Sequence, residues 1–147
     1  MESRYTKYGG YVKIKDKLTG AQLGTVSHKA AAEGNAHITD FIFSSLKATG
    51  KSDTIKKLML HKESDGKTAW YIAAEKGNKE ILEKLWCWGR EVQVNLKDDL
   101  LLSKGFDGQT AWNIAAKKDN KEILEELRVW VMEAQLNIRN HLLPAKD

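Results

Sequence analysis

The sequence predicts an all-α protein built as a helical-repeat solenoid. The segment Asp65-Gly-Lys-Thr-Ala-Trp-Tyr-Ile-Ala-Ala74 recurs 42 positions later as Asp107-Gly-Gln-Thr-Ala-Trp-Asn-Ile-Ala-Ala116. The segment Asn78-Lys-Glu-Ile-Leu-Glu83 recurs at the same spacing from Asn120. Apolar residues in these blocks follow the 3.6-residue period of a helix. No segment of useful length alternates apolar and polar residues as a strand would. Helical units that cannot bury their apolar faces alone stack into one continuous core, so the repeat itself predicts the solenoid.

A weaker copy precedes these two. The segment from Thr25 to Asn35 aligns with the segment from Thr68 to Asn78, at a spacing of 43 residues. We therefore expect a repeat domain over residues 20–147, with copies at about 20–59, 60–101 and 102–143. Residues 1–19 form an extension that we expect to cap the first copy, because the end of a solenoid otherwise exposes apolar surface. A docking arm is the alternative for this extension.

Each copy predicts two helices, of which the first is short and rich in alanine. It spans about Ala69–Lys76 in the second copy and Ala111–Lys118 in the third. Thr68 and Thr110 precede these helices, where a hydroxyl can accept a hydrogen bond from an unpaired backbone N–H. The paired alanines let neighbouring helices approach closely.

A turn follows, and then a more strongly apolar helix. Gly77-Asn78 tolerates the left-handed backbone conformation that ends many helices. We expect Asp119-Asn120 to form the same turn at a higher energetic cost. The second helix begins near Lys79 and near Lys121. Its apolar residues share one face in each copy: Ile81, Leu82, Leu85 and Trp86, and then Ile123, Leu124, Leu127, Val131 and Ala134.

Tryptophan is frequent, with five residues in the chain. Trp70 and Trp112 occupy equivalent positions in two copies, and we expect both to be buried between adjacent repeats. Trp86 lies on the apolar face of its helix, whereas Trp88 and Trp130 share a position that covers the second helix. Stacking of bases or ligands on these rings is the alternative interpretation.

Composition favours an intracellular protein that does not enter a membrane. Hydrophobic residues make up 41% and charged residues 30% of 147 residues. No apolar run approaches the roughly 18 residues of a membrane helix, and the first residues lack the apolar stretch of a signal peptide. Cys87 is the only cysteine, so no intramolecular disulfide can form. We expect a monomer in the reducing cytoplasm or nucleus.

The net charge of +4 is unevenly distributed. Residues 1–62 carry 11 Lys/Arg and 5 Asp/Glu, a balance of +6, whereas residues 63–147 carry 13 and 15, a balance of −2. A basic half can meet a phosphate backbone or an acidic protein, but it is also typical of a lysine-rich solvated surface. Nucleic-acid binding through Lys47 to Lys62 and through Lys13, Lys15 and Lys17 is therefore the alternative function.

No catalytic or metal-binding pattern emerges. The histidines, His28, His37, His61 and His141, do not have the spacing of a metal site. The neighbouring acids Asp98-Asp99 and Glu125-Glu126 point apart on a helix and so do not form an acid–base pair. We expect no enzyme activity, no cofactor and no metal.

The pattern Thr-x-x-His-x-Ala-Ala-x-x-Gly, followed by a helix with Ile/Leu pairs, resembles the ankyrin repeat family. Thr25, His28 and Gly34 match this pattern most literally. In the later copies Tyr71 and Asn113 replace the usual histidine. The period of 42 exceeds the family's 33 or so residues. The additional residues fall after the second helix, where we expect a longer helix and a longer return loop.

The resemblance implies a binding module that holds partner proteins with its hairpin tips and the exposed face of its first helices. Such a module can act as an inhibitor or as a decoy that occupies a host factor. We call the matching residues the concave strip: Ser64, Asp65, Lys67, Glu75, Lys76, Phe106, Asp107, Gln109, Lys117 and Lys118. Phe106 is the strongest candidate for a partner-binding residue, because aromatic anchors contribute much of the binding energy of an interface. Local packing against the neighbouring turn is the alternative for this ring.

Overall fold

The described part of the structure consists mainly of helices joined by turns. The computed structural model describes residues 20–63 and 65–142. The helical elements in these residues are α2 (Gly20–Glu33), α3 (Ala36–Ala48), α4 (Ser52–Leu60), α5 (Ala69–Lys76), α6 (Lys79–Glu91), the π-helical segment η1 (Leu96–Leu101), α7 (Ala111–Lys117) and α8 (Lys121–Leu142). These ranges contain no strand, which confirms the predicted all-α fold.

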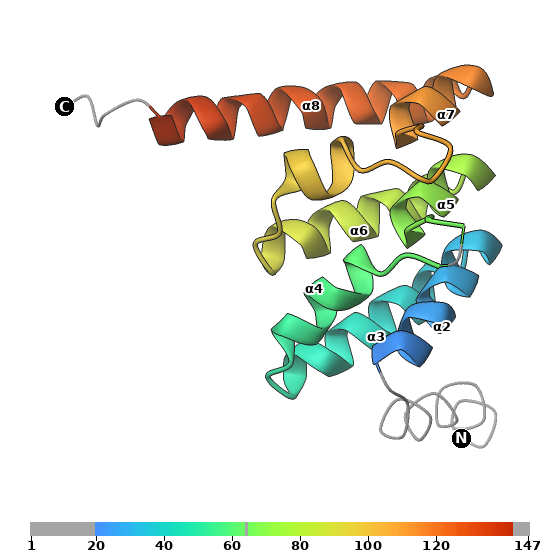
Figure 1. Cartoon of the computed structure of the whole chain (residues 1–147). Helices are drawn as coiled ribbons and strands as arrows, with labels where there is room; N and C mark the ends of the chain where they lie inside the picture. Colours follow the sequence, from blue (N-terminus) through green and yellow to red (C-terminus); the bar gives the residue numbers. More distant parts are fainter. Residues whose placement is uncertain (1–19, 64, 143–147) are drawn as a thin grey trace.

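The helices form three hairpins that stack in chain order. Helix α2 packs on α3, α5 on α6, and α7 on α8, while α5 contacts both α2 and α7. We call α2–α4 repeat one, α5–η1 repeat two, and α7–α8 repeat three. Figure 1 shows this stack from the blue end to the red end, with the long helix α8 lying across the red end. The first helices thus form one layer and the second helices another.

The predicted helix ends are confirmed in repeats two and three. The hydroxyl of Thr68 accepts a hydrogen bond from the backbone N–H of Tyr71, and Thr110 does the same for Asn113. Helix α5 ends at Gly77, whose φ of 74° is the left-handed value that glycine adopts without strain. Asp119 holds a φ of 54° at the equivalent turn, a conformation that costs a non-glycine residue energy.

Repeat one begins differently from the other two. Helix α2 already starts at Gly20, so Thr25 lies inside the helix. The end of the helix nevertheless follows the pattern, because Gly34 has a φ of 74° and the side chain of Asn35 caps α3 through the backbone N–H of Ile38. The alignment of this copy with repeat two therefore holds at the turn.

The cause of the long period was predicted only in part. The additional residues do follow the second helix, but they form a third helical segment instead of a loop: α4 in repeat one and η1 in repeat two. The chain reverses before each segment through a left-handed residue, Gly50 with a φ of 74° and Gln93 with a φ of 62°. Segment η1 then packs between α6 and α8.

A tryptophan cluster forms the core between repeats two and three. Trp86 and Trp130 stack with ring centroids 5.1 Å apart, and Trp70 lies 6.1 Å and 5.6 Å from these two rings. All three side chains are buried. Burial of Trp70 was predicted and is confirmed.

The matching prediction for Trp112 is wrong. This side chain is 41% exposed. The equivalent Trp70 is buried because repeat three lies over it, whereas in the described residues no repeat lies over Trp112. The local sequence is nearly the same at both positions, so the main difference between them is their place in the stack.

Candidate partner-binding surface

Two turns of the same geometry join the repeats. In the first, the amide of Gly66 donates to the carbonyl of Glu63 at 2.8 Å, and Oδ1 of Asp65 accepts from the amide of Lys67 at 3.0 Å. In the second, Gly108 donates to the carbonyl of Gly105 at 2.9 Å, and Asp107 accepts from Gln109 at 3.0 Å. The aspartate of each turn therefore holds its own loop closed.

One helix position connects repeat one and repeat two to the turn that follows each of them, and in repeat three it bonds within its own repeat. In repeat one it is His28, whose Nε2 lies 2.8 Å from the carbonyl oxygen of Lys67. In repeat two it is Tyr71, whose hydroxyl donates to Oδ2 of Asp107 at 2.7 Å. In repeat three it is Asn113, whose side chain accepts from the backbone amide of its own cap residue Thr110. Tyr71 was not predicted as a site residue, although it occupies the position of His28 in the repeat.

Tyr71 lies at the centre of a charged cluster. The Nζ of Lys67 lies 2.9 Å and 3.1 Å from the two carboxylate oxygens of Glu75 and 5.6 Å from the centroid of the Tyr71 ring. Since Tyr71 also binds Asp107, the cluster joins the two turns through α5. Three of the predicted residues, Lys67, Glu75 and Asp107, are thus brought together.

The cluster shifts the proton equilibria of its members. Burial, reinforced by the acceptor carboxylate of Asp107, raises the pKa of the Tyr71 phenol above its ordinary value. The hydrogen bond from Tyr71 lowers the pKa of the Asp107 carboxyl. The bond to Glu75 raises the pKa of Lys67, although burial opposes it. Each of these three shifts favours the protonation state that the hydrogen bonds of the cluster require.

Phe106 both packs on its neighbour and faces solvent. Its side chain is 76% exposed. The ring lies over Gly66 so closely that a Cβ added there would lie 2.3 Å from Cδ1 of Phe106. The aromatic ring is therefore held by one face and presents the rest to solvent.

A search with protein-family models matched ankyrin repeats, in three copies, over residues 27–140. The chain belongs to the ankyrin repeat family. No curated protein matches it. Ankyrin repeats are generally modules that bind other proteins, and the family is typically non-catalytic.

The remaining residues of the concave strip are spread along the ankyrin turns and first helices. Lys76, Lys117 and Lys118 are exposed at the ends of α5 and α7. Gln109 is half-buried, and its Oε1 is buried without a hydrogen-bond partner. Ser64 lies outside the described residues. The structure thus joins part of the strip into one cluster and leaves the three lysines apart from it.

The second helices of the ankyrin repeats are engaged with one another. The indole N–H of Trp88 donates to Oδ1 of Asp40 at 3.0 Å, and Lys84 pairs with the same carboxylate at 2.8 Å. The indole of Trp86 donates to Glu133 at 2.8 Å. These contacts link successive repeats, so the side of the molecule near Trp88 and Trp130 is less available to a partner than the turns are.

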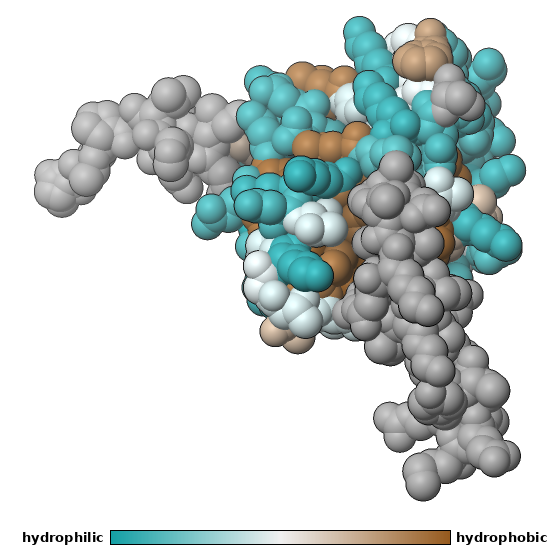
Figure 2. All heavy atoms as spheres, turned by 60° about the horizontal axis from the view of Figure 1, so that its bottom comes forward, coloured by the Kyte–Doolittle hydropathy of each residue, from teal (hydrophilic) through white to brown (hydrophobic). Residues whose placement is uncertain are grey.

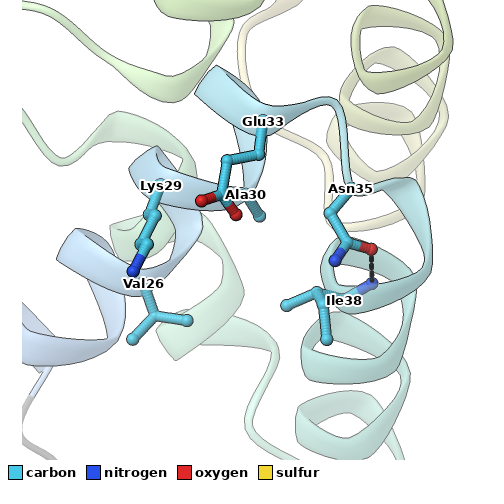
Figure 3. A pocket seen from close by; sticks show the side chains of 6 residues that line it. All are labelled: Val26, Lys29, Ala30, Glu33, Asn35 and Ile38. Atoms are coloured by element: carbon cyan, nitrogen blue, oxygen red, sulfur yellow. Dashed lines mark hydrogen bonds between the residues drawn. The ribbon is translucent and has the colours of Figure 1, made fainter.

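The repeat-one end of the ankyrin stack carries a hollow between α2 and α3. Its volume is about 220 Å³, and Figure 3 shows Lys29 and Glu33 beside the apolar side chains of Val26 and Ile38. Figure 2, turned to bring this end forward, shows brown apolar surface between teal side chains. In repeat two the same face of the hairpin packs on repeat one. The side-chain Nδ2 of Asn78 donates there to the backbone carbonyl of Ala31 at 2.6 Å. The predicted cap, residues 1–19, lies outside the described residues.

Neither a metal-binding cluster nor a membrane-spanning helix occurs in the described residues. No group of three His, Cys, Asp or Glu side chains lies close enough to hold a metal ion. None of the described helices combines the length and the apolarity needed to cross a bilayer.

Proposed function

We propose that this chain is a non-catalytic binding module that holds a partner protein on the concave strip. On this proposal the chain acts as an inhibitor or as a decoy for a host factor. Binding of a repeat array can mask a surface of the partner without altering the partner chemically.

The observation that carries the proposal is the pairing of Phe106 with the charged cluster beside it. The ring is 76% exposed and packs against Gly66, and a contact that holds the ring in place lowers the conformational entropy that binding costs. Aromatic anchors of this kind dominate the energy of many interfaces. The neighbouring charges of Lys67, Glu75 and Asp107 are held in fixed positions, which suits them to select a complementary surface.

The charges of the strip favour a protein over a nucleic acid. The strip mixes lysines with Asp65, Glu75 and Asp107, and these carboxylates would repel a phosphate backbone. Part of the basic segment of the alternative is also engaged within the fold. Lys47 pairs with Glu91, and Lys62 donates to the carbonyl of Lys104 at 3.3 Å.

The experiment compares three immobilised forms of the full chain as bait for cell extracts. The test form is the double variant Phe106→Ala/Lys117→Glu, and the matched control is Val129→Ala, which truncates an exposed apolar residue of α8. We expect a protein that wild type and control retain and that the double variant loses. Equal retention by all three forms would overturn the assignment to the concave strip. Retention of nucleic acid that disappears steeply with added salt would favour the alternative function.

A further inference from the structure

Equivalent turns between the first and second helix of each repeat carry different charges. Residues 32–37 contain one glutamate and no lysine or arginine, and residues 75–80 contain two lysines and two glutamates. Residues 117–122 contain three lysines, one aspartate and one glutamate. The formal balances are therefore −1, 0 and +1 in repeats one, two and three. The charge at this position becomes more positive along the stack.

In repeat two, the lysine and glutamate of the concave strip are paired within the fold. The Nζ of Lys67 contacts the two carboxylate oxygens of Glu75 at 2.9 Å and 3.1 Å, and both side chains are half-buried. A partner that binds either charge has to compete with this ion pair. Repeat two thus offers little uncompensated charge at this place.

Repeat three has different residues at the same two positions. Gln109 replaces Lys67, and Lys117 replaces Glu75. Since Oε1 of Gln109 is buried without a hydrogen-bond partner, it does not accept from the ammonium of Lys117. Lys117 is exposed, and none of the ion pairs among the described residues includes it. The exchange of glutamate for lysine therefore leaves a free positive charge on the strip.

Two further lysines extend this charge. Lys118 follows Lys117 at the end of α7, and Lys76 ends the neighbouring helix α5. Both are exposed and, among the described residues, neither takes part in an ion pair. We call Lys76, Lys117 and Lys118 the lysine group of the strip.

The lysine group and Phe106 lie at opposite ends of one short helix. Phe106 belongs to the turn before α7, and Lys117 is the last of the seven residues of that helix. With a rise of 1.5 Å per residue the helix is about 10 Å long, a distance that about three residues of an extended chain span. One continuous segment of a partner can therefore reach both the exposed ring and the lysine group.

We propose that the partner presents an extended acidic segment to repeat three, in which an apolar side chain contacts Phe106 and Asp or Glu side chains a few residues away bind the lysine group. This inference rests on the proposed function, because it names the chemistry of the partner that the concave strip holds. Exposed charge pairs are individually weak and act mainly on the rate of association, so the lysines supplement the aromatic anchor.

The test selects peptides of random sequence, displayed on phage, on the immobilised full chain. The peptides have about twelve residues, enough to extend over both the ring and the lysine group. The test variant is Lys117→Gln/Lys118→Gln. The matched control, Lys56→Gln/Lys57→Gln, removes the same charge from two adjacent lysines of α4 outside the strip. We expect wild type and control to enrich peptides that combine an apolar side chain with an excess of acidic residues, and the test variant to lose the acidic excess.

A second variant keeps the repeat-three site folded while it removes the free charge. Gln109→Lys/Lys117→Glu builds the Lys67–Glu75 ion pair of repeat two into repeat three. Fluorescence titration with one peptide enriched on wild type measures the effect at low salt. We expect binding about tenfold weaker in this variant and in Lys117→Gln/Lys118→Gln, and unchanged binding in the control.

The outcomes separate this inference from the proposed function. Enriched peptides that need Phe106, as Phe106→Ala shows, but carry no acidic excess would overturn the inference and leave the proposed function standing. Enrichment of no peptide that depends on Phe106 or on the lysine group would overturn both. Binding of a single-stranded oligonucleotide that requires Lys117 and Lys118, without enrichment of acidic peptides, would also overturn the inference.

Discussion

The hydroxyl of Tyr71 donates a hydrogen bond of 2.7 Å to Oδ2 of Asp107, which lies 36 residues further along the chain. The same carboxylate closes its own turn through Oδ1 and the amide of Gln109. A single side chain therefore shapes the turn of repeat three and fastens that turn to the first helix of repeat two. Stability and the geometry of the binding surface are coupled at this residue.

The first prediction concerns the dependence of stability on pH. The folded protein lowers the pKa of the Asp107 carboxyl below its ordinary value of 3.8, mainly through the bond from Tyr71. A lowered pKa contributes stability that is present above the unfolded value and is lost as the pH falls through the folded value. Tyr71→Phe removes the donor, so we expect lower stability at neutral pH and a shallower decline below about pH 4. Urea unfolding curves between acid and neutral pH measure both effects, and parallel declines in the two proteins would contradict the coupling.

The second prediction compares two tryptophans that share one sequence context. Trp70→Ala leaves a cavity between repeats two and three and should lower the free energy of unfolding by about 3–5 kcal/mol. Trp112→Ala removes a side chain that is half exposed, so we expect a loss of about 1 kcal/mol. Denaturant unfolding of the two variants provides the measurement. Equal losses would mean that Trp112 is covered in solution.

The third prediction separates two effects of substituting Gly66, namely displacement of the Phe106 ring and backbone strain in the turn. Gly66 and Gly108 have φ values of 77° and 76°, so alanine at either position costs about 1–2 kcal/mol of backbone strain. Only Gly66→Ala also displaces the ring of Phe106, because nothing lies within 4 Å of a Cβ at Gly108. We expect Gly66→Ala to weaken partner binding about tenfold, as Phe106→Ala should, and Gly108→Ala to leave binding close to wild type. Titrations against the captured partner decide the matter, and similar affinities for both alanine variants would show that the ring does not contact it.

The fourth prediction concerns the extension that precedes repeat one. The hollow lined by Val26, Ala30 and Ile38 exposes apolar surface at that end of the stack. If residues 1–18 cover it, deleting them should lower both the melting temperature and the solubility. Thermal unfolding of the full and shortened chains gives the answer, and coincident curves would indicate that the extension is a free tail instead of a cap.

Local sequence by itself determined where the first helices of repeats two and three begin and where α5 ends. Thr68, Thr110 and Gly77 act within one turn of their own position, through hydrogen bonds to nearby amides or through the backbone conformation that glycine permits. The duplication of these signals also identified the ankyrin fold, because equal sequences in equal surroundings fold alike. The third helical segments of repeats one and two were not predicted from the sequence; η1, for example, is held by its packing between α6 and α8.

Only the tertiary structure decided which copies of a repeated residue are buried or bonded. Trp70 and Trp112 occupy the same repeat position in nearly the same local sequence, yet repeat three covers the first and, in the described residues, no repeat covers the second. Tyr71 hydrogen-bonds to Asp107 because a further turn follows its helix in the stack. Asn113, at the equivalent position, accepts a hydrogen bond from Thr110 of its own repeat. Burial and long-range hydrogen bonds depend on what lies next to a residue in space, and in a stack of near-identical units that depends on position in the array.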